Sequence, residues 1–269
     1  MKNEIKLIAL DLDGTLLNSA KEISAENKAA IAAARAKNVH VVLTTGRPLV
    51  AIHHFLETLE MTGFDDFSIT FNGGLVQHNT GEILSKKPFS MKEAVDLKEL
   101  TNALDLPCDI LSEGLVYMTP SSRPSLYPTL NKLLTFKQAD LTELSENLII
   151  NKIVSCTDAD VLDMKIPEIP ITFYEKCEIF KSQAKLLEFM PKGINKAFGL
   201  EQLIKILDLK PENVMAMGDE ENDLSMISWA GHGIAMGNAV EAVKAQAQII
   251  SKLTNDENAV ADIIERYVL

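Results

Sequence analysis

The chain has 269 residues, of which 46% are hydrophobic and 24% are charged, as in an ordinary globular protein. Its 38 Asp and Glu residues outnumber its 26 Lys and Arg residues, so the formal net charge is −12. Phosphate backbones and anionic lipid headgroups repel a chain this acidic, which argues against nucleic-acid and membrane-surface partners.

Cysteine usage and the chain's first residues point to a reducing compartment. The three cysteines form no CxxC pair, so neither a disulfide framework nor a zinc site is expected. The N-terminus lacks the apolar core and small-residue cleavage site of a signal peptide. Residues 224–240, the longest uncharged stretch, are too few and too polar for a membrane span. We therefore expect a cytoplasmic protein.

The first part of the chain alternates between strand-like and helix-like segments. Residues 5–10 are an apolar run typical of a strand buried in a parallel sheet. Ser24 is a suitable N-cap for an Ala-rich helix that ends near residue 37. The next predicted elements are a strand at 39–45, a helix at 48–60 that Pro48 opens, and a strand at 67–71. Such alternation favours a parallel, doubly wound sheet.

The middle of the chain has shorter segments that prolines interrupt. Helical patterns at residues 91–103 and 124–133 mix with short β-rich pieces at 115–118, 149–156, 171–174 and 186–190. After Pro191 the alternation returns, with helices at 196–207, 223–229, 239–247 and 258–267 and strands at 214–217 and 233–236. We expect a Rossmann-like α/β core of residues 1–83 and 191–269, with residues 84–190 inserted as an α+β domain.

The clearest chemical motif is Asp11-Leu12-Asp13-Gly14-Thr15, directly after the first predicted strand. Ligands of open α/β sheets bind at this carboxyl edge. Two carboxylates two residues apart repel each other and are costly to desolvate, and a divalent cation is the usual compensation. The alternative is a solvated Asp-Gly turn.

Two further motifs follow predicted strands. Thr44-Thr45-Gly46-Arg47 offers a hydroxyl and the N–H groups of a strand-to-helix turn, which suit an oxyanion, although such turns are common. Gly218-Asp219-Glu220-Glu221-Asn222-Asp223 is either a solvated acidic loop or a Mg²⁺ site. A fourth motif, Asn195-Lys196, begins a predicted helix, where a lone lysine is most often a surface residue.

Together these motifs supply a carboxylate nucleophile, a second carboxylate, a hydroxyl, a cation and a metal site. Phosphoryl transfer needs such a set, because its transition state spreads negative charge over oxygens that must be held in line. A carboxylate nucleophile divides hydrolysis into formation and breakdown of an aspartyl-phosphate. The four motifs therefore favour a phosphoryl-transfer enzyme.

The order and spacing of the motifs resemble the haloacid dehalogenase-like (HAD) superfamily of phosphohydrolases, in particular its Cof-type branch, whose large cap follows the third core strand. The stretches 41–48 and 218–223 resemble those of YidA-type sugar phosphatases. The resemblance covers nearly the whole chain. It implies a Rossmann-like core with an inserted cap that closes over the substrate and sets specificity.

The resemblance also implies the catalytic roles. Asp11 would attack phosphorus, and Asp13 would protonate the leaving alkoxide and then activate water. Thr45 and Lys196 would bind the phosphate, with Lys196 also neutralising the nucleophile and the developing charge. The other phosphate-binding groups would be the N–H groups of Leu12 and Gly46 together with Asn222 and, reaching toward cap or substrate, Arg47.

The implied cofactor is Mg²⁺, held by the Asp11 carboxylate, the Asp13 carbonyl and Asp219, with Glu220 and Asp223 in or beside its shell. Two departures from the family pattern stand out. Ala197 follows the lysine where the family usually has Gly, with Phe198 after it, and Asn72-Gly73-Gly74 stands where Asn-Gly-Ala is common. Neither removes a catalytic group.

The expected function is a Mg²⁺-dependent phosphatase of small phosphomonoesters, sugar phosphates first. One alternative is a phosphomutase or phosphotransferase that passes the same aspartyl-phosphate to a sugar hydroxyl. Another is a phosphate-sensing or signalling module without turnover, against which Asp13 and the large insert argue. The expected partner is a small phosphate ester, and the sequence leaves open whether the chain is a monomer or a homodimer.

Overall fold

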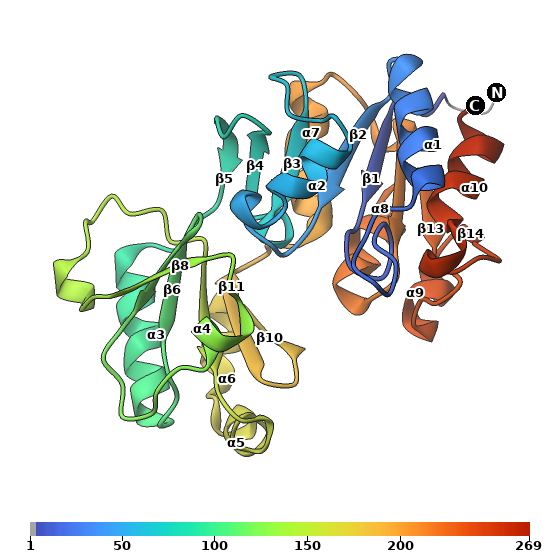
Figure 1. Ribbon diagram of the computed structural model, residues 1–269. Helices are drawn as coiled ribbons and strands as arrows, with labels where there is room; N and C mark the ends of the chain where they lie inside the picture. The colour runs from blue at the N-terminus through green and yellow to red at the C-terminus, as the bar shows by residue number, and fades with distance from the viewer. Residues whose placement is uncertain (1–3) are drawn as a thin grey trace. The chain divides into compact units, whose positions relative to one another are not determined.

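The computed structural model describes residues 4–269 and divides into two compact units, drawn in Figure 1. The core unit comprises the chain up to Arg47, Ile52–Lys86 and Asn195–Leu269, and the inserted unit comprises Lys87–Ile194 with the short segment Pro48–Ala51. The units thus change at Lys86 and Ile194, slightly beyond the limits expected from the sequence, because the last strand of the core sheet continues to Lys86.

The core unit is built on an eight-stranded sheet in the order β14-β13-β12-β1-β2-β3-β4-β5. Its parallel strands are β1 (Leu7–Leu10), β2 (His40–Thr44), β3 (Phe67–Thr70), β12 (Val214–Gly218), β13 (His232–Ala235) and β14 (Ile249–Ile250). The antiparallel strands β4 (Leu75–His78) and β5 (Ile83–Lys86) extend one edge. The expected doubly wound α/β core is confirmed.

Helices alternate with the parallel strands of the core, and the last of them follows the final strand β14. They are α1 (Ala25–Ala36), α2 (His53–Thr58), α7 (Lys196–Ile206), α8 (Leu224–Trp229), α9 (Glu241–Gln246) and α10 (Ala259–Tyr267). Ser24 caps α1 as expected, since its side chain accepts the N–H of Asn27 at 3.2 Å. The helix expected over residues 48–60 is broken: Leu49–Ala51 is a 3₁₀ turn, and α2 begins only after Ile52.

The inserted unit has a six-stranded sheet in the order β10-β11-β9-β6-β7-β8. Its strands are β6 (Asp109–Ser112), β7 (Leu115–Met118), β8 (Thr135–Gln138), β9 (Lys152–Cys156), β10 (Cys177–Gln183) and β11 (Leu186–Pro191). Its helices are α3 (Met91–Ala103), α4 (Tyr127–Leu130), α5 (Ala159–Lys165) and α6 (Ile171–Lys176). Buried Phe89, Leu97, Ile110, Ile153 and Phe189 belong to its own apolar core.

Several expectations for the inserted unit were wrong in detail. The β-branched residues at 171–174 suggested a strand, but α6 spans Ile171–Lys176, with Pro170 in extended geometry at its N-cap. The helix expected over 124–133 is reduced to the single turn of α4. Strands β6, β8 and β10 were not predicted; β8 and β10 are the two edge strands of this sheet, and β6 lies between β9 and β7.

Within the described residues 4–269, no helix is long and apolar enough to cross a membrane. The three cysteines, Cys108, Cys156 and Cys177, are buried free thiols. Burial raises the pKa of the Cys108 thiol to about 11, so this thiol stays protonated and unreactive at neutral pH.

The sheet topology brings the motifs together. Strand β1 lies between β2 and β12, and both neighbours run parallel to it. Leu10, the last residue of β1, is in register with Leu43 and Met217. The residues that follow these three strands therefore converge at one edge, where ligands of open α/β sheets bind.

Candidate active site

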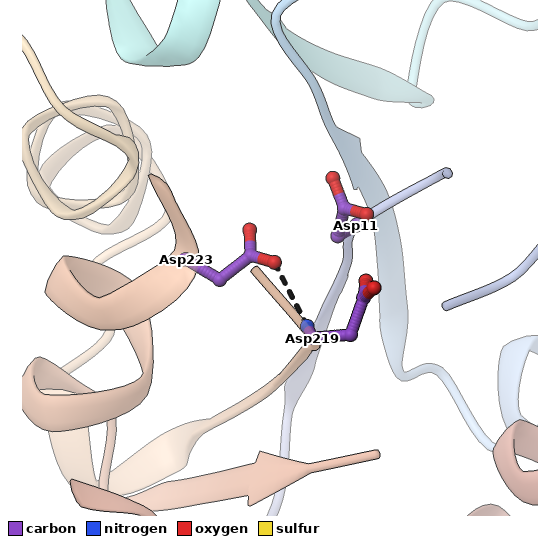
Figure 2. Close-up of side chains that lie close together, drawn as sticks. All are labelled: Asp11, Asp219 and Asp223. Atoms are coloured by element: carbon purple, nitrogen blue, oxygen red, sulfur yellow. Dashed lines mark hydrogen bonds between the residues drawn. The ribbon is translucent and has the colours of Figure 1, made fainter. Parts of the chain in front are cut away.

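Three buried carboxylates meet at the carboxyl edge of the core sheet. Asp11 follows β1, Asp219 follows β12, and Asp223 ends the 3₁₀ turn Glu221–Asp223. One carboxylate oxygen of each lies within 4.8 Å of those of the other two, and Figure 2 shows all three side chains beside one another. Carboxylate oxygens are hard donors, and they are the ligands that Mg²⁺ prefers in proteins.

Lys196 supplies the positive charge of this cluster. It is fully buried at the start of α7, where Asn195 caps the helix by accepting the N–H of Phe198 at 2.9 Å. Its ammonium donates to Asp11 and, at 2.6 Å, to Asp223. One ammonium thus faces three carboxylates, which leaves an excess of negative charge.

The protonation of the cluster reflects this excess. Burial, reinforced by the neighbouring Asp223, raises the pKa of Asp11 to about 8 despite Lys196. Burial likewise raises the pKa of Asp219 to about 7, against the hydrogen bond from Thr15. Burial alone would lower the pKa of Lys196, but Asp11 and Asp223 raise it above its ordinary value. The carboxylates therefore need more positive charge than the chain provides, and a divalent cation fits this need.

Asp223 and Asp219 are held by their neighbours. One oxygen of Asp223 accepts from Lys196, and the other accepts the N–H groups of Asp219 at 2.9 Å and Glu220 at 3.1 Å. Thr15 donates to Asp219 at 2.9 Å. Asp223 is thus engaged on both oxygens, which leaves Asp11 and Asp219 as the better placed direct metal ligands.

Gly14 and Glu220 border the cluster. Gly14 has a φ of +84°, and a Cβ there would overlap the Asp219 carboxylate, so only glycine fits this close approach. Glu220 has an exposed side chain and does not belong to the carboxylate cluster. Of the five residues expected at the metal, the structure therefore brings together the carboxylates of Asp11, Asp219 and Asp223.

Asp13 is half-exposed and bound by two cations. The Arg47 guanidinium donates to both of its oxygens, at 2.9 and 2.6 Å, and Lys21 donates at 3.0 Å. Burial would raise the pKa of Asp13, but Arg47 and Lys21 together hold it below its ordinary value. Arg47, expected to reach toward the inserted domain or a substrate, thus contacts the carboxylate expected to act as acid and base.

The Thr45-Gly46 turn lies next to Asn72 and Asn222. Thr45 is buried, and its hydroxyl accepts the N–H of Arg47 at 3.2 Å. The carbonyl of Thr45 accepts the N–H of Asn72 at 2.9 Å, and the Asn72 side chain accepts from Asn222 at 3.4 Å. Three of the residues expected to bind phosphate, Thr45, Gly46 and Asn222, therefore share one neighbour, Asn72.

The remaining expected residue is Leu12, whose side chain is fully buried, so it can serve a ligand only through its backbone N–H. No role for Thr15, Lys21 or Asn72 is predicted from the sequence. Thr15 ends the Asp11–Thr15 motif, and Asn72 lies just after the strand β3. Their positions near the ends of parallel strands could have indicated that both residues lie at the site. Lys21 has no such signal.

The parallel sheet, the carboxylate cluster and the buried lysine define a hydrolase of phosphoric monoesters of the haloacid dehalogenase-like class. The model of the haloacid dehalogenase-like hydrolase family matches residues 8–264, and the chain belongs to this family. A Streptococcus pyogenes protein named as a phosphatase is 35% identical over 270 residues, which cover 98% of this chain and 99% of that one.

Two further relatives support the assignment. A Bacillus subtilis protein named 5-amino-6-(5-phospho-D-ribitylamino)uracil phosphatase is 33% identical over 270 residues, covering 99% of this chain and 97% of its own. The crystal structure of a haloacid dehalogenase-like hydrolase from Bacteroides thetaiotaomicron has a TM-score of 0.85 and 35% identity, over 98% of this chain and 99% of that one.

Proposed function

We propose that the protein is a Mg²⁺-dependent phosphatase that hydrolyses small phosphomonoesters through an aspartyl-phosphate on Asp11. The observation that supports this best is Lys196, buried between Asp11 and Asp223 with Asp219 beside them. A fully buried lysine with more than one carboxylate is costly unless the cluster has a task.

Asp11 and Asp219 would hold the cation directly, with the Asp13 carbonyl as a further ligand and Asp223 and Glu220 beside the shell. A bound Mg²⁺ would offset the negative charge of the carboxylates and of the phosphate oxygens. The raised pKa values of Asp11 and Asp219 support this role, because burial makes their ionised forms costly and a divalent cation would offset that cost.

The chemistry takes two steps. An oxygen of Asp11 attacks phosphorus, the bond from phosphorus to the ester oxygen breaks, and the alkoxide takes a proton from Asp13. Water then attacks the phosphorus of the aspartyl-phosphate and gives a proton to Asp13, the bond from phosphorus to the Asp11 oxygen breaks, and inorganic phosphate leaves the regenerated carboxylate. Lys196, Thr45 and the N–H groups of Leu12 and Gly46 stabilise the charge on the phosphate oxygens in both steps.

Asp13 must carry a proton for the first step. Its contacts with Arg47 and Lys21 favour the ionised form, which suits the second step, where it accepts a proton. We propose that the Arg47 contact loosens when a phosphate ester binds, because the phosphate competes for the same guanidinium.

The substrate is proposed to be a small cytoplasmic phosphate ester, with sugar and sugar-alcohol phosphates first. The Bacillus subtilis relative is named for a ribityl phosphate, and the inserted unit is the part we expect to select the leaving group. A phosphotransferase would use the same Asp11, so products must be analysed with a sugar acceptor present. Release of inorganic phosphate identifies hydrolysis, and a new sugar phosphate identifies transfer.

The test is Asp11→Asn. It removes the nucleophile but keeps the shape of the side chain, so phosphate release from a panel of sugar, ribityl and pyridoxal phosphates should fall by at least about 10³-fold. Chelation of Mg²⁺ should abolish release by the wild type, and added Mg²⁺ should restore it. Exposed Asp208→Asn, in the same unit, is the matched control and should retain full activity. Substantial release by Asp11→Asn would overturn the assignment.

A further inference from the structure

The segment Phe71–Gly73, the 3₁₀ turn after β3, has an unusual backbone. Phe71 and Asn72 are consecutive non-glycine residues with φ of +51° each, and Gly73 follows with φ of +100°. Residues other than glycine rarely adopt this left-handed backbone conformation. Where they do, the surrounding structure must hold them there. Such backbones gather at functional sites, so this turn calls for an explanation.

The turn contacts three of the four motifs. The N–H of Asn72 donates to the Thr45 carbonyl at 2.9 Å. The Asn72 carboxamide lies so close to Gly46 that a Cβ on Gly46 would be 3.1 Å from it. The same carboxamide accepts from Asn222 of the acidic loop at 3.4 Å.

The third contact is with the start of α7. Gly73 packs so tightly that a Cβ on it would overlap the carbonyl oxygen of Asn195, the residue before Lys196. A Cβ on Gly199, one turn along α7, would lie 2.8 Å from the Gly73 Cα. The turn therefore touches the Thr45-Gly46 turn, the loop that carries Asn222 and the helix that carries Lys196.

We propose that Asn72 is a positioning residue for the phosphate group. Its buried carboxamide packs across Gly46 and accepts from Asn222, and so it fixes the distance between two groups that would bind phosphate oxygens. The left-handed backbone is what directs this carboxamide toward Gly46. The inference rests on the proposed function, because it assigns Gly46 and Asn222 to phosphate.

The test separates positioning from stability. Asn72→Gly removes the carboxamide and relieves the left-handed backbone, whereas Asn72→Ala removes the carboxamide and keeps the strain. We expect both variants to weaken binding of inorganic phosphate, measured by calorimetry with Mg²⁺ present, by at least fivefold. In turnover, both should show a higher KM with a smaller change in kcat. Asn72→Gly should melt at or above the wild-type temperature, and Asn72→Ala below it.

Asn38→Gly is the matched control, since Asn38 is also left-handed, with φ of +60°, but lies exposed after α1. It should leave phosphate binding and KM unchanged. If Asn72 acts through Asn222, the effects of Asn72→Gly and Asn222→Ala on phosphate affinity will not add in the double variant.

Wild-type phosphate affinity in Asn72→Gly would overturn the positioning role, as would a defect that follows melting temperature and appears only in Asn72→Ala. Failure of the proposed function looks different: the wild type would bind phosphate but release none from any ester. The binding measurement therefore tests Asn72 even where turnover fails.

Discussion

Each unit buries a lysine, but the two units balance its charge differently. In the inserted unit, Lys152 donates to one oxygen of Glu188 at 2.9 Å, and Ser182 donates to the other at 2.8 Å. In the core unit, Lys196 faces Asp11 and Asp223, with Asp219 adjacent.

The first lysine pairs with Glu188, whose carboxylate is hydrogen-bonded on both oxygens. The second is outnumbered, and burial together with the neighbouring carboxylate Asp223 raises the pKa values of Asp11 and Asp219. Both lysines are nearly or fully buried, so burial does not distinguish them. Charge balance separates an ion pair that holds a fold together from a cluster prepared for a cation and a phosphate.

Removing the outnumbered lysine should have the largest effect. Lys196→Met leaves three carboxylates without an ammonium, and kcat should fall by about 10²–10³-fold or more. Steady-state phosphate release from the best ester of the panel measures this. Because the cluster then lacks even more positive charge, Mg²⁺ should raise the melting temperature of the variant by more than it raises that of the wild type.

Lys205→Met provides the comparison, since Lys205 is exposed on the same helix α7 and its loss should leave kcat unchanged. A Lys196→Met variant that folds and keeps kcat within about threefold of the wild type would show that the buried ammonium is structural, like Lys152.

Removing the matched lysine should act on stability. Lys152→Met leaves the Glu188 carboxylate buried without its partner, with side-chain exposures of 5% and 6% in the native pair. Loss of one member of a buried pair costs about 3–5 kcal/mol in the free energy of unfolding. Urea denaturation measures the loss. The double variant Lys152→Met/Glu188→Leu should recover most of it, because no lone charge remains.

The surface pair of Lys185 and Asp158, at 2.9 Å and with side chains 46% and 66% exposed, sets the scale. Lys185→Met should cost less than about 1 kcal/mol. If Lys152→Met lowered the free energy of unfolding no more than Lys185→Met does, the buried pair would contribute no more stability than the surface pair. The assignment of a structural role to Lys152 would then be wrong.

The sequence predicted the core well because its signals are local and repeated. Apolar runs predicted β1, β2, β3 and β12, and a motif follows three of these four strands. Since parallel strands share their carboxyl edge, order along the chain sufficed to bring Asp11, Thr45 and Asp219 to one side of the sheet.

The sequence could not predict contacts that depend on packing. Nothing in the residue type makes Lys196 a buried residue, because lysine is nearly always exposed, and only its combination with the other three motifs and the family resemblance placed it at the site. The Arg47–Asp13 pair and the left-handed Asn72 arise from tertiary structure. In the inserted unit, β-branched residues at 171–174 favoured a strand, yet packing and Pro170 made a helix.

The smallest effect we predict sharpens the comparison through pH. Asp109 in β6 is buried in the inserted unit, accepts from Ser125, and has its pKa raised by burial to about 6. Between the ordinary value of 3.8 and about 6, the folded chain holds a proton on Asp109 that the unfolded chain has lost. The free energy of unfolding should therefore fall as pH rises through this window, by at most about 3 kcal/mol.

Asp109→Asn abolishes this titration, so its stability curve should be flatter than that of the wild type between pH 4 and 7. Asp11 and Asp219 contribute similar slopes at higher pH, but they are present in both proteins and cancel in the difference. Asp105→Asn differs in both sign and pH range: a hydrogen bond from Ser122 and the neighbouring Arg123 lower the pKa of Asp105, so the stability it contributes is lost only as pH falls below the ordinary value of 3.8. Parallel curves for the wild type and Asp109→Asn, measured by urea denaturation at each pH, would mean that burial leaves the pKa of Asp109 at its ordinary value, unlike those of Asp11 and Asp219.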